Sequence, residues 1–228
     1  MIPNKDTMAK TAKEEYGQST GKEVVEYLAA LFGAVTAAWE KWQSNIKFGG
    51  TIVKGSGVGA WTGTGSEGIL QGGSYKMEDF EFKGNSPQQK KFSKALGDTL
   101  TIKFKLFLTT YKITKLTYSG SSGASNTSPG PVSASCAGTP LKGAGEGTNL
   151  SGIADDWMAI LRADPDFNID NPACKSKGLI AAIAKVIERE FQLTWLSTAK
   201  LVNNKLSATG APGGVVPGTK TGMDGVIS

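Results

Sequence analysis

Apolar residues recur every three or four positions in two long segments of the chain. One segment begins after Thr20 and the other near Ser176, and the spacing predicts two amphipathic helices. A capping box formed by Thr20 and Glu23 precedes the first helix, and Gly49-Gly50 is expected to end it. The two apolar stripes are Val24, Leu28, Leu31, Val35, Trp39, Trp42 and Ile46, and Ile180, Ile183, Ile187, Phe191, Thr194, Trp195, Thr198 and Val202.

Each of these helices leads into a glycine-rich segment, residues 51–75 and 205–228. Large apolar residues such as Trp61 and Ile69 stand alone among the glycines, and Pro212 and Pro217 disfavour both helix and central strand. The pattern predicts extended arms that lie on a surface. Because glycine is costly to order, these arms are expected to become ordered mainly on assembly.

The two ends of the chain resemble each other. A long helix that carries a tryptophan is followed in both by a glycine-rich arm, which predicts a repeated helix-plus-arm unit. The corresponding pairs are Trp39 with Trp195, Ile46 with Val202, Val58 with Val215, Gly65 with Gly222, Glu67 with Asp224 and Gly68 with Gly225.

The middle of the chain is ambiguous. Ser86-Pro87-x-Gln89 forms a second capping box, with proline at the first helical position. Residues 99–118 fit both a helical period and the strict alternation of a strand. With the glycine- and serine-rich residues 119–149, this region would be a third, more degenerate copy of the unit.

These patterns predict a mainly α protein with extended Gly-rich arms and short β-strands, in an α+β arrangement of repeated helix-plus-arm units. A short helix is expected from Ser151 to Asp164-Pro165. The expected divisions are a flexible N-terminal arm (1–18), a first unit (19–75), a degenerate second unit (76–149), a short helix and loop (150–175) and a third unit (176–228).

The composition changes this picture little. The 228 residues include 30 glycines, and hydrophobic (39%) and charged (20%) residues are both fewer than is typical of a compact enzyme. The net charge is +5, with basic residues scattered, which favours an ordinary solvated surface. A module that binds nucleic acid or another polyanion through scattered lysines is the alternative function.

No apolar stretch approaches the roughly 18 residues that span a bilayer, so no membrane partner is expected.

The candidate chemistry is sparse. The absence of histidine removes Ser-His-Asp and Cys-His nucleophile systems. Asp155 and Asp156 are neighbours that would point about 100° apart on a helix, so they do not form a facing pair. The acidic segment 164–170 resembles the start of a calcium loop but lacks its glycine and glutamate, which favours a turn. No catalytic, cofactor or metal site is predicted, and the chain is not expected to be an enzyme.

The two cysteines, Cys136 and Cys174, show no zinc-binding spacing. Free thiols are expected, with a disulfide between them left open.

A protein interface is the most specific functional hypothesis. Trp61 lies inside a glycine-rich arm, where an aromatic anchor that docks into a neighbour is an alternative to burial in this chain's own core. The hypothesis assigns interface roles to Trp61, Val58, Ile69, Val215, Val216, Val226 and Ile227.

The C-terminal segment LIAAIAKVIEREFQLTW…SATGAPGGVVPGTKTGMDGVIS and its N-terminal echo resemble segments of small virion structural proteins of tailed bacteriophages. The resemblance covers about half of the chain. It implies a component of the tail or baseplate, of the neck, or of the capsid surface, made in the bacterial cytoplasm and incorporated into the virion. Other virion proteins and further copies of the chain itself are the implied partners.

Overall fold

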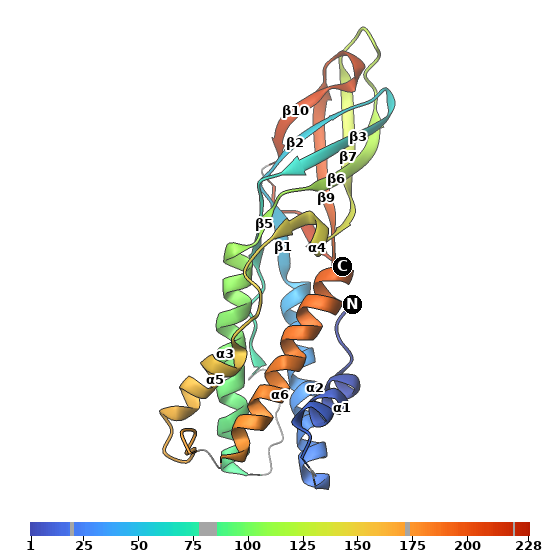
Figure 1. Ribbon diagram of the computed structural model, residues 1–228. Helices are drawn as coiled ribbons and strands as arrows, with labels where there is room; N and C mark the ends of the chain where they lie inside the picture. Colours follow the sequence, from blue (N-terminus) through green and yellow to red (C-terminus); the bar gives the residue numbers. More distant parts are fainter. Residues whose placement is uncertain (19–20, 78–85, 172–173, 221) are drawn as a thin grey trace. The chain divides into compact units, whose positions relative to one another are not determined.

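The computed structural model describes residues 1–18, 21–77, 86–171, 174–220 and 222–228. Long helices accompany a large curled antiparallel sheet, which has eleven strands in the described residues (Figure 1). The expectation of a mainly α protein with short strands and extended arms is therefore wrong. The predicted arms are strands of this sheet, and their glycines allow close strand packing.

The chain forms two compact units, and each combines segments that are distant in the sequence. A helical unit consists of Met1–Trp42, Ser74–Leu106 and Asn149–Trp195. A sheet unit consists of Gln43–Gly73, Phe107–Thr148 and Leu196–Ser228. Each of the expected helix-plus-arm segments contributes its helix to the first unit and its glycine-rich part to the second.

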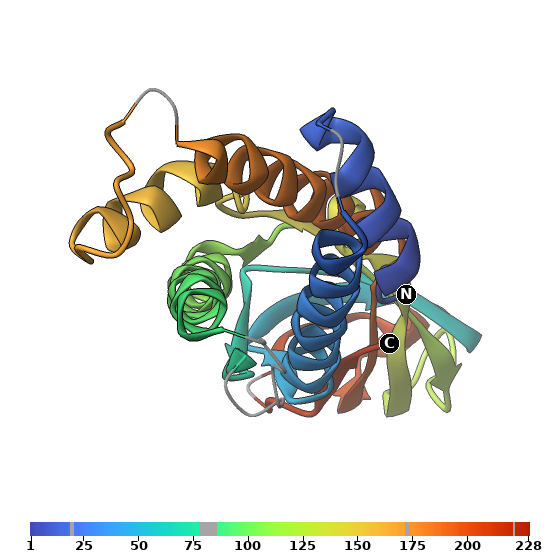
Figure 2. The same ribbon diagram turned by 90° about the horizontal axis from the view of Figure 1, so that it is seen from below.

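The helical unit is built from helices that pack side by side (Figures 1 and 2). Their bounds are α1 (Lys5–Tyr16), α2 (Lys22–Ser44), α3 (Pro87–Thr110), α5 (Ile153–Arg162) and α6 (Lys175–Arg189), and α6 continues into a π-helical turn, η2 (Glu190–Trp195). The helices α2 and α3 end beyond the borders of the unit. None of the described helices is long and apolar enough to cross a membrane.

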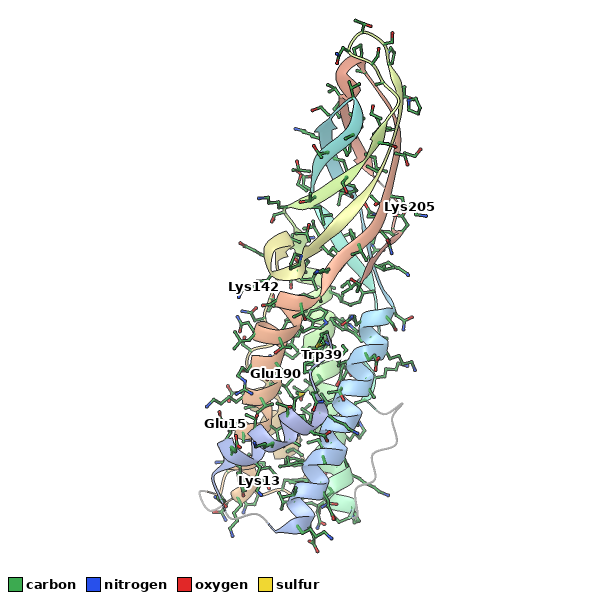
Figure 3. The ribbon with its side chains drawn as sticks, turned by 90° about the vertical axis from the view of Figure 1, so that its right-hand side faces the viewer. Lys13, Glu15, Trp39, Lys142, Glu190 and Lys205 are labelled. Carbon is green, nitrogen blue, oxygen red and sulfur yellow. The ribbon has the colours of Figure 1, made fainter. Side chains whose placement is uncertain are left out.

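An aromatic cluster forms the core of the helical unit. The rings of Trp42 and Phe104 meet edge to face with centroids 4.5 Å apart, and Phe191 stacks on Trp195 at 5.0 Å. Trp39 contacts three of these rings and points into the unit (Figure 3). The tryptophans of the predicted stripes are thus core residues, which confirms that interpretation of the helical pattern.

The N-terminal residues form helix α1 in place of a loose arm. The Asn4 side chain caps the helix by accepting hydrogen bonds from the backbone of Asp6 and Thr7, and Met8 is fully buried. Lys185 of α6 pairs with Glu15 at 2.6 Å. The small apolar positions of this polar segment are enough to pack α1 against α6 (Figure 2).

Helix capping matches the sequence at one site and differs at another. Ser86 and Gln89 form the predicted reciprocal capping box, with bonds of 3.2 and 3.3 Å. Ser151 does not cap α5, because Gly152 occupies the cap position and the Ser151 carbonyl instead accepts a bond from Lys103. The proposed box at Thr20 lies outside the described residues.

The ambiguous middle segment contains both structures in succession. The helix α3 continues to Thr110, with Leu100, Phe104 and Phe107 buried and Ile102 61% exposed. A strand would have buried Ile102 on the same face as Phe104. The buried residues of this segment therefore follow the period of a helix and not that of a strand. Strands begin only after Tyr111.

Three β-hairpins make up the sheet unit, and each follows one of the long helices (Figure 1). The first hairpin consists of β1 (Ile46–Gly49), β2 (Thr51–Ser56), β3 (Gly59–Ser66) and β4 (Gly68–Gly72). The second consists of β5 (Lys112–Ile113), β6 (Leu116–Ser122), β7 (Gly130–Pro140), the short helix α4 (Leu141–Ala144) and β8 (Gly145–Glu146). The third follows α7 (Leu196–Thr198) and consists of β9 (Lys200–Gly210), the 3₁₀ turn η3 (Pro212–Gly214), β10 (Val216–Lys220) and β11 (Gly225–Ile227).

Strand pairing links each of the three hairpins to both of the others. The strands β3 and β4 pair with β6 and β5, which joins the first hairpin to the second. The strand β7 pairs with β9, which joins the second to the third. The strands β10 and β11 then pair with β2 and β1, so the third hairpin returns to the first.

The glycines of the first hairpin make room for Trp61. A Cβ atom at Gly55 or Gly63 would lie 2.4 Å from the indole ring, so no larger residue fits either position without movement. Trp61 is fully buried as a result. The combination of glycines and tryptophan that predicted an extended arm is therefore a packing arrangement inside a sheet.

Candidate functional site

The structure separates the proposed interface residues into two groups. Trp61, Val216 and Ile227 are buried in the sheet unit, and Ile69 and Val226 are half-buried. Val58 and Val215 are exposed, at 48% and 45%. Only these two present a large apolar side chain to solvent.

Val58 and Val215 lie at neighbouring hairpin tips. The backbone N–H of Gly57 donates to the Gly213 carbonyl at 3.0 Å, and the Trp61 indole N–H donates to the Gly214 carbonyl at 2.8 Å. The tip of the second hairpin joins them, because Gly213 N–H donates to the Ser125 carbonyl at 2.8 Å. All three tips are thus tied together at one end of the sheet (Figure 1).

Beside these tips, the outer side of the sheet carries a continuous array of hydroxyl groups. Register places Thr62 opposite Ser119 and Ser121 opposite Ser133, so these side chains project from the same side of the sheet. All members are exposed except Ser135, which is half-buried. We call this array the hydroxyl face; it comprises Thr62, Thr64, Thr117, Ser119, Ser121, Ser133, Ser135, Ser207 and Thr209.

The hydroxyl face is uncharged. No Asp, Glu, Lys or Arg occurs in residues 55–66, 116–140 or 206–219, although the chain has 25 basic and 20 acidic residues. Lys54 and Lys205 stand at its borders, opposite Thr64 and Ser135, and Figure 3 marks Lys205 on β9. Within the described part of the chain, none of the nine hydroxyls makes a side-chain hydrogen bond, so they are available to another molecule.

Sequence reasoning missed this face, although a signal for it exists. Ser or Thr stands at every second position in TGT (62–64), TYSGS (117–121) and SAS (133–135). A period of two places such residues on one side of a strand. The glycines between them directed the interpretation toward irregular arms instead.

The opposite side of the sheet contains a buried polar network that draws residues from all three hairpins. Tyr118 donates to the Asn204 side-chain oxygen, and its hydroxyl lies 3.0 Å from that of Thr51. The Asn204 amide donates to Asp224 at 2.8 Å and to the Phe48 carbonyl at 3.3 Å. Burial raises the pKa of Tyr118 to about 12, so its hydroxyl remains protonated at neutral pH. The network connects the hairpins internally.

A small cavity of about 220 Å³ lies in the helical unit among the first turns of α2, α3 and α6. Its lining is mostly apolar, and the Tyr27 hydroxyl at its wall already bonds Ser93 at 3.1 Å. Burial raises the pKa of Tyr27, which keeps this hydroxyl neutral. The pocket is open to solvent, and the Tyr27 hydroxyl at its wall is engaged by Ser93.

The acidic segment 164–170 is a turn held by basic residues. Lys91 pairs with Asp164 at 3.1 Å and with Asp166 at 2.5 Å. The Asp164 side chain accepts a bond from the backbone N–H of Asp166, and this bond, together with Lys91, lowers the pKa of Asp164. Among the described residues, no group of three or more His, Cys, Asp or Glu is placed to hold a metal ion.

Both cysteines are free thiols. Cys136 is buried and donates to the Leu201 carbonyl at 2.8 Å, and burial raises the pKa of its thiol. A buried neutral thiol of this kind is a packing residue rather than a nucleophile.

Several lysines of the described chain are already paired with carboxylates, which reduces the positive charge available to a polyanion. The paired lysines are Lys10, Lys22, Lys91, Lys94, Lys103 and Lys185.

No model of a known protein family matches the chain, and no curated protein matches it. The hydroxyl face with its two tip valines is therefore the best-defined candidate site, and it is assigned from its geometry and chemistry.

Proposed function

We propose that this chain is a structural component of a tailed-bacteriophage virion, in the tail, baseplate or neck, and that it docks onto other proteins through the hydroxyl face and the tip valines. The observation that carries the proposal is the neutrality of an exposed sheet surface in a chain whose 25 basic and 20 acidic residues all lie outside the three segments that form it. The likeness of both chain ends to phage structural segments supplies the context of a particle.

The physical argument concerns desolvation. The contact area of a protein interface is depleted in charged residues, because an unpaired charge removed from water is costly. Ser and Thr hydroxyls both donate and accept hydrogen bonds, so their desolvation is compensated by a partner's backbone or side chains. Val58 and Val215 add apolar area at the tip.

The proposal is tested on gradient-purified particles of the phage that encodes the chain. Quantitative mass spectrometry is expected to find the chain at a fixed copy number per particle. A variant with Ser121→Lys and Ser133→Lys is expected to enter particles at least tenfold less than wild type, because both charges would be buried on docking. Thr7→Lys, at an exposed position of α1, is the matched control and should enter normally.

Two results would overturn the proposal. One is the absence of the chain from purified particles. The other is normal incorporation of the double-lysine variant, which would show that the chain does not dock through the hydroxyl face.

A further inference from the structure

We propose that the partner seated on the hydroxyl face is a second copy of this chain. The inference rests on the proposed assembly function and specifies the occupant of its docking surface. Two properties of the face support this occupant, its charge and its hydrogen-bonding chemistry, and its area sets the strength of the contact.

Charge restricts how two copies can approach. Each copy carries a net charge of +5, so contacts that bring lysine-bearing surfaces together are repulsive. The hydroxyl face excludes charge from three separate segments of the sequence and keeps Lys54 and Lys205 at its borders. It therefore lets two copies meet without opposing like charges at the centre of the contact.

The chemistry of the face is self-complementary. A contact related by a twofold axis presents the same patch from both sides, so each group must be able to bond its own kind. Hydroxyls satisfy this requirement because each is both donor and acceptor, whereas carboxylates and ammonium groups do not. Ser and Thr are also short, so little side-chain entropy is lost when the contact forms.

The area predicts a weak contact. Four neighbouring strands about 4.8 Å apart, each with about five residues at about 3.3 Å, cover on the order of 300 Å² per copy. A stable pair usually buries about 800 Å² per partner. Even with Val58 and Val215 at the tip, the isolated chain should dimerise only at high concentration, and the contact would act mainly where assembly raises the local concentration.

Sedimentation equilibrium of the full chain over micromolar to millimolar concentrations tests the proposal. Wild type is expected to form dimers reversibly at the upper concentrations. Ser121→Lys and Ser121→Glu should each raise the dissociation constant at least tenfold, because either substitution places two like charges in a twofold contact. Thr62→Lys, in the neighbouring row of the face, should have the same effect, while Thr7→Lys should leave association unchanged.

The mixture of the two Ser121 variants is the decisive measurement. An equimolar mixture at low salt is expected to recover dimers, since opposite charges now face each other across the contact, and added salt should remove them. Circular dichroism and thermal melting establish that each variant is folded.

Three outcomes would overturn the self-contact: a wild-type chain that stays monomeric at millimolar concentration, variants that associate like wild type, or a mixture that recovers nothing. Incorporation into particles is measured independently. A chain that enters particles but never dimerises would refute the second copy as occupant while leaving the structural function standing. A chain that dimerises but is absent from particles would refute the structural function alone.

Discussion

At the scale of single residues, the sheet unit depends on one buried amide. Asn204 is fully buried, yet its side chain is satisfied by Tyr118, Asp224 and the backbone of Phe48. A buried polar group is tolerated when it is bonded and is costly when a partner is removed. The network therefore favours the arrangement in which all three hairpins are in register.

Removal of the Asn204 amide should destabilise the protein. Asn204→Ala leaves buried partners unsatisfied and is expected to lower the free energy of unfolding by about 2 kcal/mol. Asn126→Ala, in the exposed tip of the second hairpin, is the control and should change it by less than about 0.5 kcal/mol. Urea denaturation measures both, and equal effects would show that the network contributes nothing.

The folded protein should lose stability at alkaline pH through the ionisation of Tyr118. Its folded pKa of about 12 lies above the ordinary value of about 10, so the folded state binds the proton more tightly. The contribution of this group is fully present below about pH 10 and is lost as the pH rises toward 12. Urea titrations of wild type and Tyr118→Phe between pH 9 and 11.5 should show a steeper decline in wild type. Parallel declines would contradict the assignment.

At the scale of elements, burial periodicity separates helix from strand. In α3 the buried residues follow the helical period, and Ile102 is exposed although it alternates with Phe104 in the sequence. Gly55 of β2 and Gly63 of β3 leave no room for a larger side chain, because the Trp61 ring lies against both positions. A glycine-rich sequence is therefore compatible with a well-packed strand when an aromatic ring covers it.

Glycine substitutions should differ sharply between two elements. A Cβ at Gly63 would lie 2.4 Å from the Trp61 ring, so Gly63→Ala is expected to cost roughly 1–3 kcal/mol through overpacking. Nothing lies within 4 Å of a Cβ at Gly143 in α4, so Gly143→Ala should be neutral or stabilising. Thermal melting compares the two, and a neutral Gly63→Ala would contradict the packing of Trp61.

At the scale of the whole molecule, the order of elements along the chain repeats three times. A long helix is followed by an antiparallel hairpin after α2, after α3 and after α6. The helices contribute to one compact unit and the hairpins to the other. The sheet requires β2 near the start of the chain to pair with β10 near its end, so folding depends on contacts of very long sequence separation.

The hairpins should be ordered in the isolated chain. Backbone amides of β3, which pairs with both β2 and β6, are expected to exchange slowly, and those of β10, which pairs only with β2 in the described sheet, more rapidly. Hydrogen exchange on the monomer measures this gradient. Exchange of residues 59–66 at unprotected rates would instead support ordering of these segments only on assembly.

Sequence reasoning identified a substantial part of this molecule. The apolar stripes located α2 and α6, although α2 ends at Ser44 before the expected Gly49-Gly50, and the last stripe residues, Ile46 and Val202, lie in β1 and β9. The Ser86 capping box located the start of α3, and the two-ended resemblance located the helix-to-glycine transitions. These features depend on spacing and capping within about twenty residues, which a sequence displays directly. The exposure of Val58 and Val215 also fits the proposed interface, whereas Trp61, Val216 and Ile227 became core residues.

The amino-acid sequence by itself determined where α2, α3 and α6 begin, which of their faces are apolar, and that charge is excluded from three glycine- and serine-rich segments. Only the tertiary structure decided that these segments are strands, and that they bring their hydroxyls together on one surface. The physical reason is that a glycine-rich strand has little local preference of its own. Its conformation is set by cross-strand partners up to about 170 residues away, such as β2 with β10, and by the aromatic ring that covers it.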